Sequence, residues 1–287
     1  MWPFDRAPVV PVLRLTGPIG MASPLRPGLS IRGLAGPIEK AFEMSKAPSV
    51  AVVVNSPGGS AAQSHLIYKR IRQLADETEK RVYVFCEDVA ASGGYFIAAA
   101  GDEIHADPSS LVGSIGVISS SFGLDKILKR LEIDYRVHTA GTSKNILDPF
   151  LPEKPEDVAR LRAIQADIHD VFIGVVKERR GAKLKGPDAE LFSGAFWAGA
   201  KALELGLVDG ISDVRTRMRE IHGPKVKLRP VPLERGGLLS RLRRLPGAGS
   251  GTGAGLLAVD GDALRLALAD DLVSAVEIRA LWSRYGI

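Results

Sequence analysis

The sequence predicts an α/β fold built on a parallel sheet, because strand-like and helix-like segments alternate along its first half. The clearest strand is the continuous β-branched run at residues 49–54, which is typical of a strand buried on both faces. The segment after it carries Ile67, Ile71 and Leu74 at helical spacing. A second apolar run, residues 81–85, comes next and leads into another apolar segment. This alternation predicts right-handed crossovers between parallel strands.

The segments before this unit predict one more strand and one more helix. Residues 9–15 are apolar and predict a first strand, which ends at Gly17 and Pro18. Residues 36–44 predict a helix with Pro37 near its first position, where the missing N–H of proline has no helical partner to lose.

The segments after residue 100 predict shorter elements. Residues 104–106 and 113–117 predict short strands, residues 124–131 a helix, and residues 133–138 another strand followed by a loop over 139–149. Residues 200–209 predict a short helix that stops at Gly206 and leads into a strand.

A long helix is predicted to begin at Pro155. One stripe of it carries apolar residues at helical spacing: Val158, Leu161, Ile164, Ile168, Val171 and Val175. Such a stripe indicates core packing or a subunit contact, and we assign it no chemistry.

The composition changes after Pro232, so we expect a main domain at residues 1–230 and a tail at 231–287. The tail begins with leucines alternating with Arg241, Arg243 and Arg244, and continues through a Gly-rich linker at 246–255. Residues 256–285 predict an apolar helix that docks on a partner or on the main domain. The basic segment also fits contact with a membrane surface, and a mobile tail is the alternative.

Composition excludes several classes of function. The 287 residues carry a net charge of +5, but no basic helix is interleaved with aromatics, which argues against nucleic-acid binding. The one cysteine, Cys86, lies in an apolar run and excludes an intramolecular disulfide. The five histidines show no metal-ligand spacing, so we expect neither metal nor cofactor. With no signal peptide and no apolar run of about 18 residues, the sequence predicts a cytoplasmic protein that could contact the inner membrane face peripherally.

The chemistry is expected at Ser92, where a predicted strand runs through small residues into Gly93 and Gly94 and then into a helix. A serine there projects from a helix start, beside free backbone N–H groups and the positive end of the helix dipole. Glycines let a substrate carbonyl approach those N–H groups. A nucleophilic serine needs this arrangement, although a plain N-cap is the alternative.

A second glycine turn, residues 55–59, follows the other buried strand. Sites in open parallel sheets form at the carboxyl ends of strands. Gly59 and Gly93 could therefore supply two oxyanion donors from neighbouring strand ends. An ordinary Pro-Gly turn is the alternative.

A serine nucleophile needs a base, and the residues leave its identity open. His138 lies at the end of a predicted strand and is the only histidine we expect near the carboxyl edge of the sheet. His105 lies in a short polar segment, and His169 lies beside the stripe of the long helix. Lys144 lies in the loop after the same strand as His138. A lysine can deprotonate a serine only where burial or nearby positive charge lowers its pKa.

Taken together, these segments resemble the signal peptide peptidase A (protease IV, SohB-like) family of Ser-Lys serine proteases, over about residues 9–215. That family has the Clp/crotonase fold, with repeated ββα units and a parallel sheet. The matching segments occur in the family's order: residues 16–19 (Thr-Gly-Pro-Ile), 55–59 (Asn-Ser-Pro-Gly-Gly), 90–98, 113–117 (Gly-Ser-Ile-Gly-Val), the Lys144 loop ending at 148–150, and 202–209.

The resemblance implies roles for individual residues. It makes Ser92 the nucleophile and favours Lys144 over His138 as the general base, with Gly59 and Gly93 at the oxyanion hole. Gly58, Gly94 and Ser114 match neighbouring positions that support the site or bind substrate. The resemblance also implies a homo-oligomeric ring in which Ser and Lys of each site come from neighbouring protomers.

The resulting hypothesis is a serine endopeptidase that cleaves extended, apolar peptides through an acyl-enzyme, with no nucleic-acid partner. Three alternatives remain. A crotonase-fold acyl-CoA enzyme shares the paired oxyanion N–H groups without a nucleophilic serine. A non-catalytic oligomeric scaffold would use neither Ser92 nor Lys144, and a Clp-like Ser-His-Asp protease would use His138.

Overall fold

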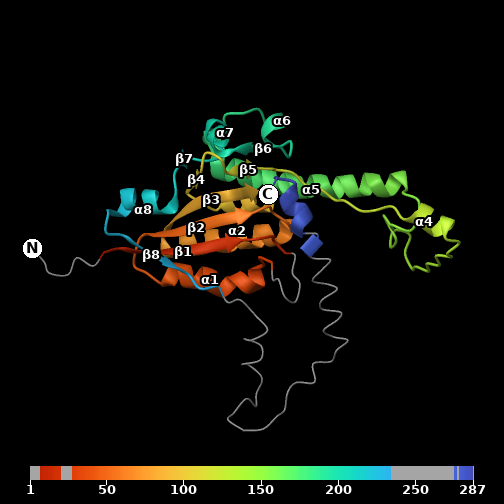
Figure 1. The fold of residues 1–287 in the computed structure, drawn as a ribbon, viewed down its shortest axis with the longest axis horizontal. Coiled ribbons are helices and arrows are strands. Elements are labelled where there is room, and N and C mark those ends of the chain that lie inside the picture. The colour runs from red at the N-terminus through yellow and green to blue at the C-terminus, as the bar shows by residue number, and fades with distance from the viewer. Residues whose placement is uncertain (1–6, 21–27, 234–274, 277, 287) are drawn as a thin grey trace, which may run out of the picture.

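The computed structural model describes residues 7–20, 28–233, 275, 276 and 278–286, and its centre is an eight-stranded sheet (Figure 1). The strands β6-β5-β3-β2-β1-β8 are neighbours in this order, while β4 pairs with β3 and β7 pairs with β4. All pairs are parallel except β5 with β6. The predicted α/β class with a parallel sheet, of the Clp/crotonase type, is confirmed.

The strands are β1 (Val9–Thr16), β2 (Ser49–Ser56), β3 (Arg81–Ala91), β4 (Glu103–Ala106), β5 (Leu111–Gly113), β6 (Phe196–Ala198), β7 (Gly210–Ile211) and β8 (Lys227–Pro230). The helices are α1 (Ile31–Glu43), α2 (Ala61–Thr78), α3 (Gly93–Ala98), α4 (Asp125–Arg130), α5 (Pro155–Arg180), α6 (Asp188–Leu191), α7 (Gly199–Glu204) and α8 (Val214–His222).

The central strands are buried on both faces, as the β-branched run predicts. In β2, Val52 and Val54 pack in the core that includes α1 and α2, whereas Ala51 and Val53 pack in a second core that includes Met218 of α8. Because side chains alternate along a strand, helices on both sides of the sheet are needed to cover this run.

Strand β3 is longer than predicted and continues to Ala91, directly before Ser92. Its first half pairs with β4 and its second half with β5, while β2 lies along the other edge. The polar residues Glu87 and Asp88 interrupt the apolar pattern, so the sequence does not predict that the strand continues. They are accommodated because Glu87 pairs with Arg14 at 2.7 Å and Asp88 accepts a hydrogen bond from Asn55 at 2.7 Å.

Helix α1 begins five residues before its predicted start. Ser30 caps it by accepting a hydrogen bond from the N–H of Gly33 at 3.3 Å. Pro37 therefore lies inside the helix rather than near its first position. The cap decides the boundary because it satisfies a backbone donor that would otherwise be unpaired.

The strand predicted at residues 133–138 is absent, and this prediction is wrong. The segment has no regular structure, and each of its residues is exposed. It belongs to an arm, residues 118–154, which lies with α4 at the end of α5 far from the sheet (Figure 1). An apolar run needs a neighbouring strand to complete its hydrogen bonds, and the arm has none in a single chain.

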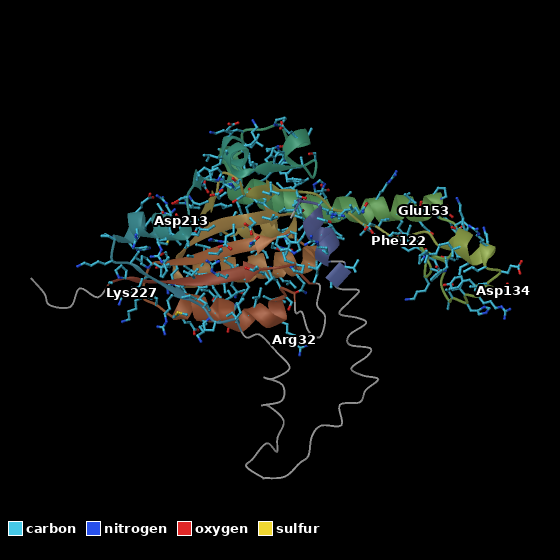
Figure 2. All side chains as sticks on the ribbon, viewed as in Figure 1. Arg32, Phe122, Asp134, Glu153, Asp213 and Lys227 are labelled. Carbon is cyan, nitrogen blue, oxygen red and sulfur yellow. The ribbon has the colours of Figure 1, made fainter. Side chains whose placement is uncertain are left out.

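Helix α5 confirms the predicted long helix, but its apolar stripe is packed only at one end. Val175 is buried against the sheet, whereas Ile164 and Val171 are 45% and 49% exposed. Figure 2 shows Phe122 and Asp134 beside the projecting end of α5, away from the sheet. The stripe is therefore core packing at the carboxyl end of α5, whereas toward the other end its residues are partly buried or exposed.

Most of the predicted tail, including the Arg241–Arg244 segment and the Gly-rich linker, lies outside the described residues. The part that is described is helical at residues 275–276 and 278–283. Within the described portion of the chain, no helix is both long enough and apolar enough to span a bilayer.

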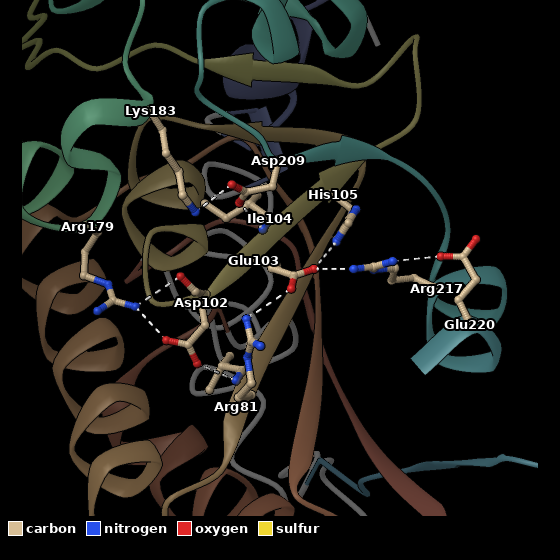
Figure 3. A network of polar contacts seen from close by, with 12 residues as sticks. Arg81, Asp102, Glu103, Ile104, His105, Arg179, Lys183, Asp209, Arg217 and Glu220 are labelled. Carbon is tan, nitrogen blue, oxygen red and sulfur yellow. Dashed lines mark hydrogen bonds and ion pairs between the residues drawn. The ribbon is translucent and has the colours of Figure 1, made fainter. Parts of the chain in front are cut away.

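A buried ion pair between Arg180 and Asp209 ties α5 to the edge of the sheet, and Figure 3 shows the carboxylate of Asp209 with its second partner, Lys183. The Arg180 guanidinium donates to Asp209 at 2.7 Å and to the carbonyl of Gly206 at 2.8 and 3.0 Å. Lys183 reaches the same carboxylate at 2.7 Å. Burial alone would raise the pKa of Asp209, but the bonds from Arg180 and Lys183 lower it to about 2. This carboxylate therefore stabilises the fold above about pH 4, and the contribution is lost as the pH falls toward 2.

We expect Arg180→Met to lower the free energy of unfolding by about 3–5 kcal/mol, because it leaves a buried carboxylate and carbonyl short of donors. Chemical denaturation measures this loss. The matched variant is Lys183→Met, whose side chain is 47% exposed and which we expect to cost about 1 kcal/mol or less. If both variants lost the same free energy of unfolding, burial of the Arg180–Asp209 pair would not explain how strongly that pair stabilises the fold.

Candidate active site

Ser92 lies at the turn between β3 and α3, as predicted. Its φ of +52° is unusual for a residue with a side chain, and such a conformation costs about 1–3 kcal/mol. The backbone holds it there, because the Ser92 N–H donates to Gly113 at 2.8 Å and its carbonyl accepts from Phe96 at 3.0 Å. The side chain makes no capping hydrogen bond. Helix capping therefore does not account for this serine.

The turn after β2 touches Ser92 closely. A Cβ added to Gly58 would lie 2.8 Å from the Cβ of Ser92 and 2.8 Å from the nitrogen of Gly93. Gly58 also has a φ of +97°, which residues with side chains rarely adopt. Only glycine lets the two turns approach this closely.

Gly59 directs its N–H toward the strand that carries Ser92. On one side, Ile19 donates to Gly58 at 2.8 Å and accepts from Ser60 at 2.9 Å. Gly59 is the residue between these two bonds in the parallel bridge with Ile19. In such a bridge, the N–H of this residue points to the side away from Ile19. That side faces β3, because β2 lies between β1 and β3.

Gly93 supplies a second N–H beside Ser92. It is the first residue of α3, where backbone N–H groups have no acceptor within the helix. Gly59 and Gly93 thus lie at neighbouring strand ends, and Gly93 directly follows Ser92. The N–H groups of such a pair can bind an oxygen that develops negative charge.

Gly94 and Ser114 complete the surroundings of Ser92. A Cβ on Gly94 would lie 2.5 Å from the carbonyl oxygen of Ser56, so glycine lets α3 pack onto the end of β2. Ser114 directly follows Gly113, which accepts the Ser92 N–H. Ser114 has a φ of +53° and donates its N–H to Ala195 at 2.6 Å. Both residues therefore lie next to the nucleophile candidate.

A single chain does not bring Lys144 to Ser92. Lys144 is exposed in the arm, and its N–H donates to Gly141 at 3.3 Å within a local turn. The arm lies beyond the end of α5, whereas Ser92 lies at the sheet (Figure 1). The candidate base and the candidate nucleophile are thus separated by the length of the projecting helix.

The histidines do not provide an alternative base within the chain. His138 lies exposed in the arm, and His169 contacts the carbonyl of Ile115 at 3.0 Å. His105 stacks on Phe85, and Glu103 lies 3.2 Å from its Nε2. Burial lowers the pKa of His105 despite that carboxylate. Within the residues that the structure describes, none of these histidines hydrogen-bonds to Ser92.

A hollow of about 590 Å³ lies away from Ser92, at the edge where β3 and β4 begin. Its lining is mostly charged, and several of these side chains pair with one another (Figure 3). Arg217, for example, donates to both Glu103 and Glu220 at 2.9 Å. Because these groups neutralise one another and the hollow lacks the Ser92 turn, we assign the site to the Ser92 edge.

Two aromatic residues near Ser92 were missed in the sequence. The hydroxyl of Tyr285 lies 3.4 Å from the carbonyl oxygen of Pro57 and 3.4 Å from Oγ of Ser114. Its ring packs edge-on against Phe196, with centroids 5.1 Å apart. These residues are distant in sequence and belong to no recognised motif, so only folding reveals the contact.

In the described parts of the chain, no group of three or more His, Cys, Asp or Glu side chains could hold a metal ion. The site consists instead of a hydroxyl group and backbone N–H groups.

The family model described as "Peptidase family S49" matches residues 75–227, which is more than half of the chain and includes Ser92 and Lys144. The chain belongs to peptidase family S49. This agrees with the resemblance to signal peptide peptidase A drawn from the motifs. As an S49 member, the protein is classed with serine peptidases, and its mostly parallel sheet fits the fold of that family.

Relatives support the same placement. A putative protease of Synechocystis is 30% identical over 209 residues, covering 73% of this chain and 72% of the relative. The chloroplastic serine protease SPPA of Arabidopsis thaliana is 29% identical over 269 residues, covering 86% of this chain and 39% of the relative.

Another relative carries a different name. A Brucella abortus protein named Na(+)/H(+) antiporter NhaA is 52% identical over 279 residues, which cover 97% of this chain. The chain spans only 37% of that relative's length. The match therefore concerns one part of a much longer protein, and the family model places peptidase sequence in the matched part.

Proposed function

We propose that this S49 member is a serine endopeptidase in which Ser92 is the nucleophile and Lys144 of a neighbouring protomer is the general base. The observation that carries the proposal is the strained turn at Ser92, which precedes Gly93 and lies against Gly58 of the neighbouring glycine turn. We propose the N–H groups of Gly59 and Gly93 as the oxyanion donors. Backbone strain that surrounding structure maintains is typical of functional sites. In this proposal, the Ser92 turn presents the serine hydroxyl beside two oxyanion donors.

The chemistry follows from these groups. The neutral Lys144 amine takes the Ser92 proton while the serine oxygen bonds to the peptide carbonyl carbon. The carbonyl oxygen becomes an oxyanion and accepts hydrogen bonds from Gly59 and Gly93. When the C–N bond breaks, Lys144 returns the proton to the leaving amine and an acyl-enzyme ester remains. Water then loses a proton to Lys144 and attacks the ester carbon. As the bond from this carbon to the Ser92 oxygen breaks, Lys144 gives the proton to that oxygen, which releases the acid and restores Ser92 and the neutral amine.

Assembly is part of this proposal because Lys144 is exposed and remote from Ser92 in one chain. The arm and α5 also expose large apolar side chains: Ile118, Phe122, Ile127, Leu131, Ile133, Ile164 and Val171. Phe122 alone is 84% exposed. Burying such a surface is favourable by about 25 cal/mol per Å² of apolar area. A second copy, receiving the arm beside its own Ser92, would bury both the arm and the amine.

Head-to-tail contacts of this kind form rings when the rotation closes. We therefore propose a homo-oligomeric ring with sites shared between protomers. Within each chain, we propose residues 1–230 as the catalytic domain and residues 231–287 as an extension. The proposed substrates are extended, apolar peptides, which fits the exposed Phe196 ring near Ser114.

A fluorophosphonate probe tests the proposal, because it phosphonylates only activated serines. We expect the full-length protein to be labelled once per chain, with the adduct on the peptide that contains Ser92. The crotonase-type alternative predicts binding of acyl-CoA and no labelling. The scaffold alternative predicts neither. An intact oligomer that resists the probe would contradict the proposed nucleophile.

A further inference from the structure

The described C-terminal residues lie against the candidate active site. Figure 1 shows this segment in blue beside the sheet, close to the label of the C-terminus. The contacts come from Tyr285, which reaches Pro57 and Ser114 with its hydroxyl and Phe196 with its ring.

Tyr285 bridges both walls around Ser92. One wall is the turn after β2, where Pro57 precedes Gly58, the glycine that touches Ser92. The other wall is the end of β5, where Ser114 follows Gly113, which accepts the Ser92 N–H. A side chain that contacts both segments lies beside the turn that carries Ser92.

The sequence of the segment fits a docked helix. Ile278, Leu281, Trp282 and Tyr285 are all partly buried and recur at the spacing of one helical face. Arg279, Ser283 and Arg284 lie between them and are exposed. The partly buried residues therefore share one face of the segment and the exposed residues the other, and Tyr285, on the partly buried face, contacts the main domain.

We infer that the segment 278–286 is an intramolecular ligand of the Ser92 site and competes with peptide substrate for it. The inference rests on the proposed function, because it takes the Ser92 edge as the place where substrate binds. The segment is itself an aromatic, apolar peptide, the chemistry proposed for the substrate. The two long hydrogen bonds and one aromatic pair form a contact that substrate can displace.

The test compares the labelling rate of Ser92 in three full-length variants. Tyr285→Ala is expected to raise the second-order rate of fluorophosphonate labelling by about 3- to 10-fold, the range that corresponds to losing one aromatic pair. Tyr285→Phe keeps the ring and is expected to change the rate by less than about twofold. The matched control is Arg284→Ala, on the exposed face of the same segment, which should label at the parental rate.

A second measurement does not depend on catalysis. Hydrogen exchange at residues 56–60 and 113–117 should quicken in Tyr285→Ala and stay unchanged in Arg284→Ala. Labelling and exchange that both match the parent in Tyr285→Ala would overturn the inference. If no variant is labelled, the proposed nucleophile fails, and the exchange data alone still decide whether the segment covers this site.

Discussion

Replacing Ser92 by alanine is expected to abolish peptide cleavage, with kcat/KM falling by about a thousandfold or more. The reason is chemical, because the variant lacks the oxygen that bonds to the substrate carbonyl. The oxyanion donors of Gly59 and Gly93 are backbone groups and remain in place. The decrease should therefore appear mainly in kcat, since substrate binding at the same edge is retained. A fluorogenic apolar peptide and the full-length protein provide the measurement.

The matched control for this variant is Ser109→Ala. Ser109 is exposed in the loop before β5, and its backbone N–H rather than its hydroxyl bonds to Asp107. Its removal should leave cleavage unchanged. Because Ser92 sits in a strained conformation, melting temperatures of both variants should be compared with the parent. A folded Ser92→Ala protein that cleaves at the parental rate would contradict the proposed mechanism.

Mixing two inactive variants is expected to restore activity. Lys144→Ala and Ser92→Ala should each be inactive alone at neutral pH. In a mixed ring, a site works when the Ser92 of one chain meets the Lys144 of the other variant. With equal, random mixing this occurs at about one quarter of the sites, so about a quarter of the parental activity should return. Co-expression with two affinity tags isolates the mixed oligomers for assay.

The control for Lys144 is Lys126→Ala, because Lys126 is another exposed lysine of the arm, on α4. It should retain parental activity alone. Mixed oligomers that form but remain inactive would show that the two residues do not combine across a subunit boundary. Loss of activity in His138→Ala, with Lys144→Ala active, would instead favour the Ser-His-Asp alternative.

The sequence predicted the parts of the site that depend on neighbouring residues. The turn at Ser92 follows from an apolar strand, two glycines and a short apolar helix, which are all local signals. The close approach of Gly58 is predictable for the same reason, since consecutive glycines after a buried strand favour a tight turn. The extension of β3 to Ala91 was missed because Glu87 and Asp88 find partners on other strands.

The arm shows where local patterns mislead. Residues 133–138 have the composition of a strand, but strand formation needs a pairing edge, and the fold places this segment beyond the sheet. The stripe of α5 has the spacing of a buried helix face, yet Ile164 and Val171 remain exposed. For both residues 133–138 and the α5 stripe, the sequence pattern indicates an apolar surface but does not predict which part of the protein covers it.

The sequence by itself thus determined the α/β class, the Ser-Gly-Gly turn and the glycine turn beside it, because periodicity and glycine content act over a few residues. Only the tertiary structure decided that the Gly59 N–H faces β3, that Lys144 lies away from the Ser92 of its own chain, and that Tyr285 reaches the site. These relations join residues far apart in the chain, and they depend on how the sheet, the arm and the C-terminal segment are placed in space.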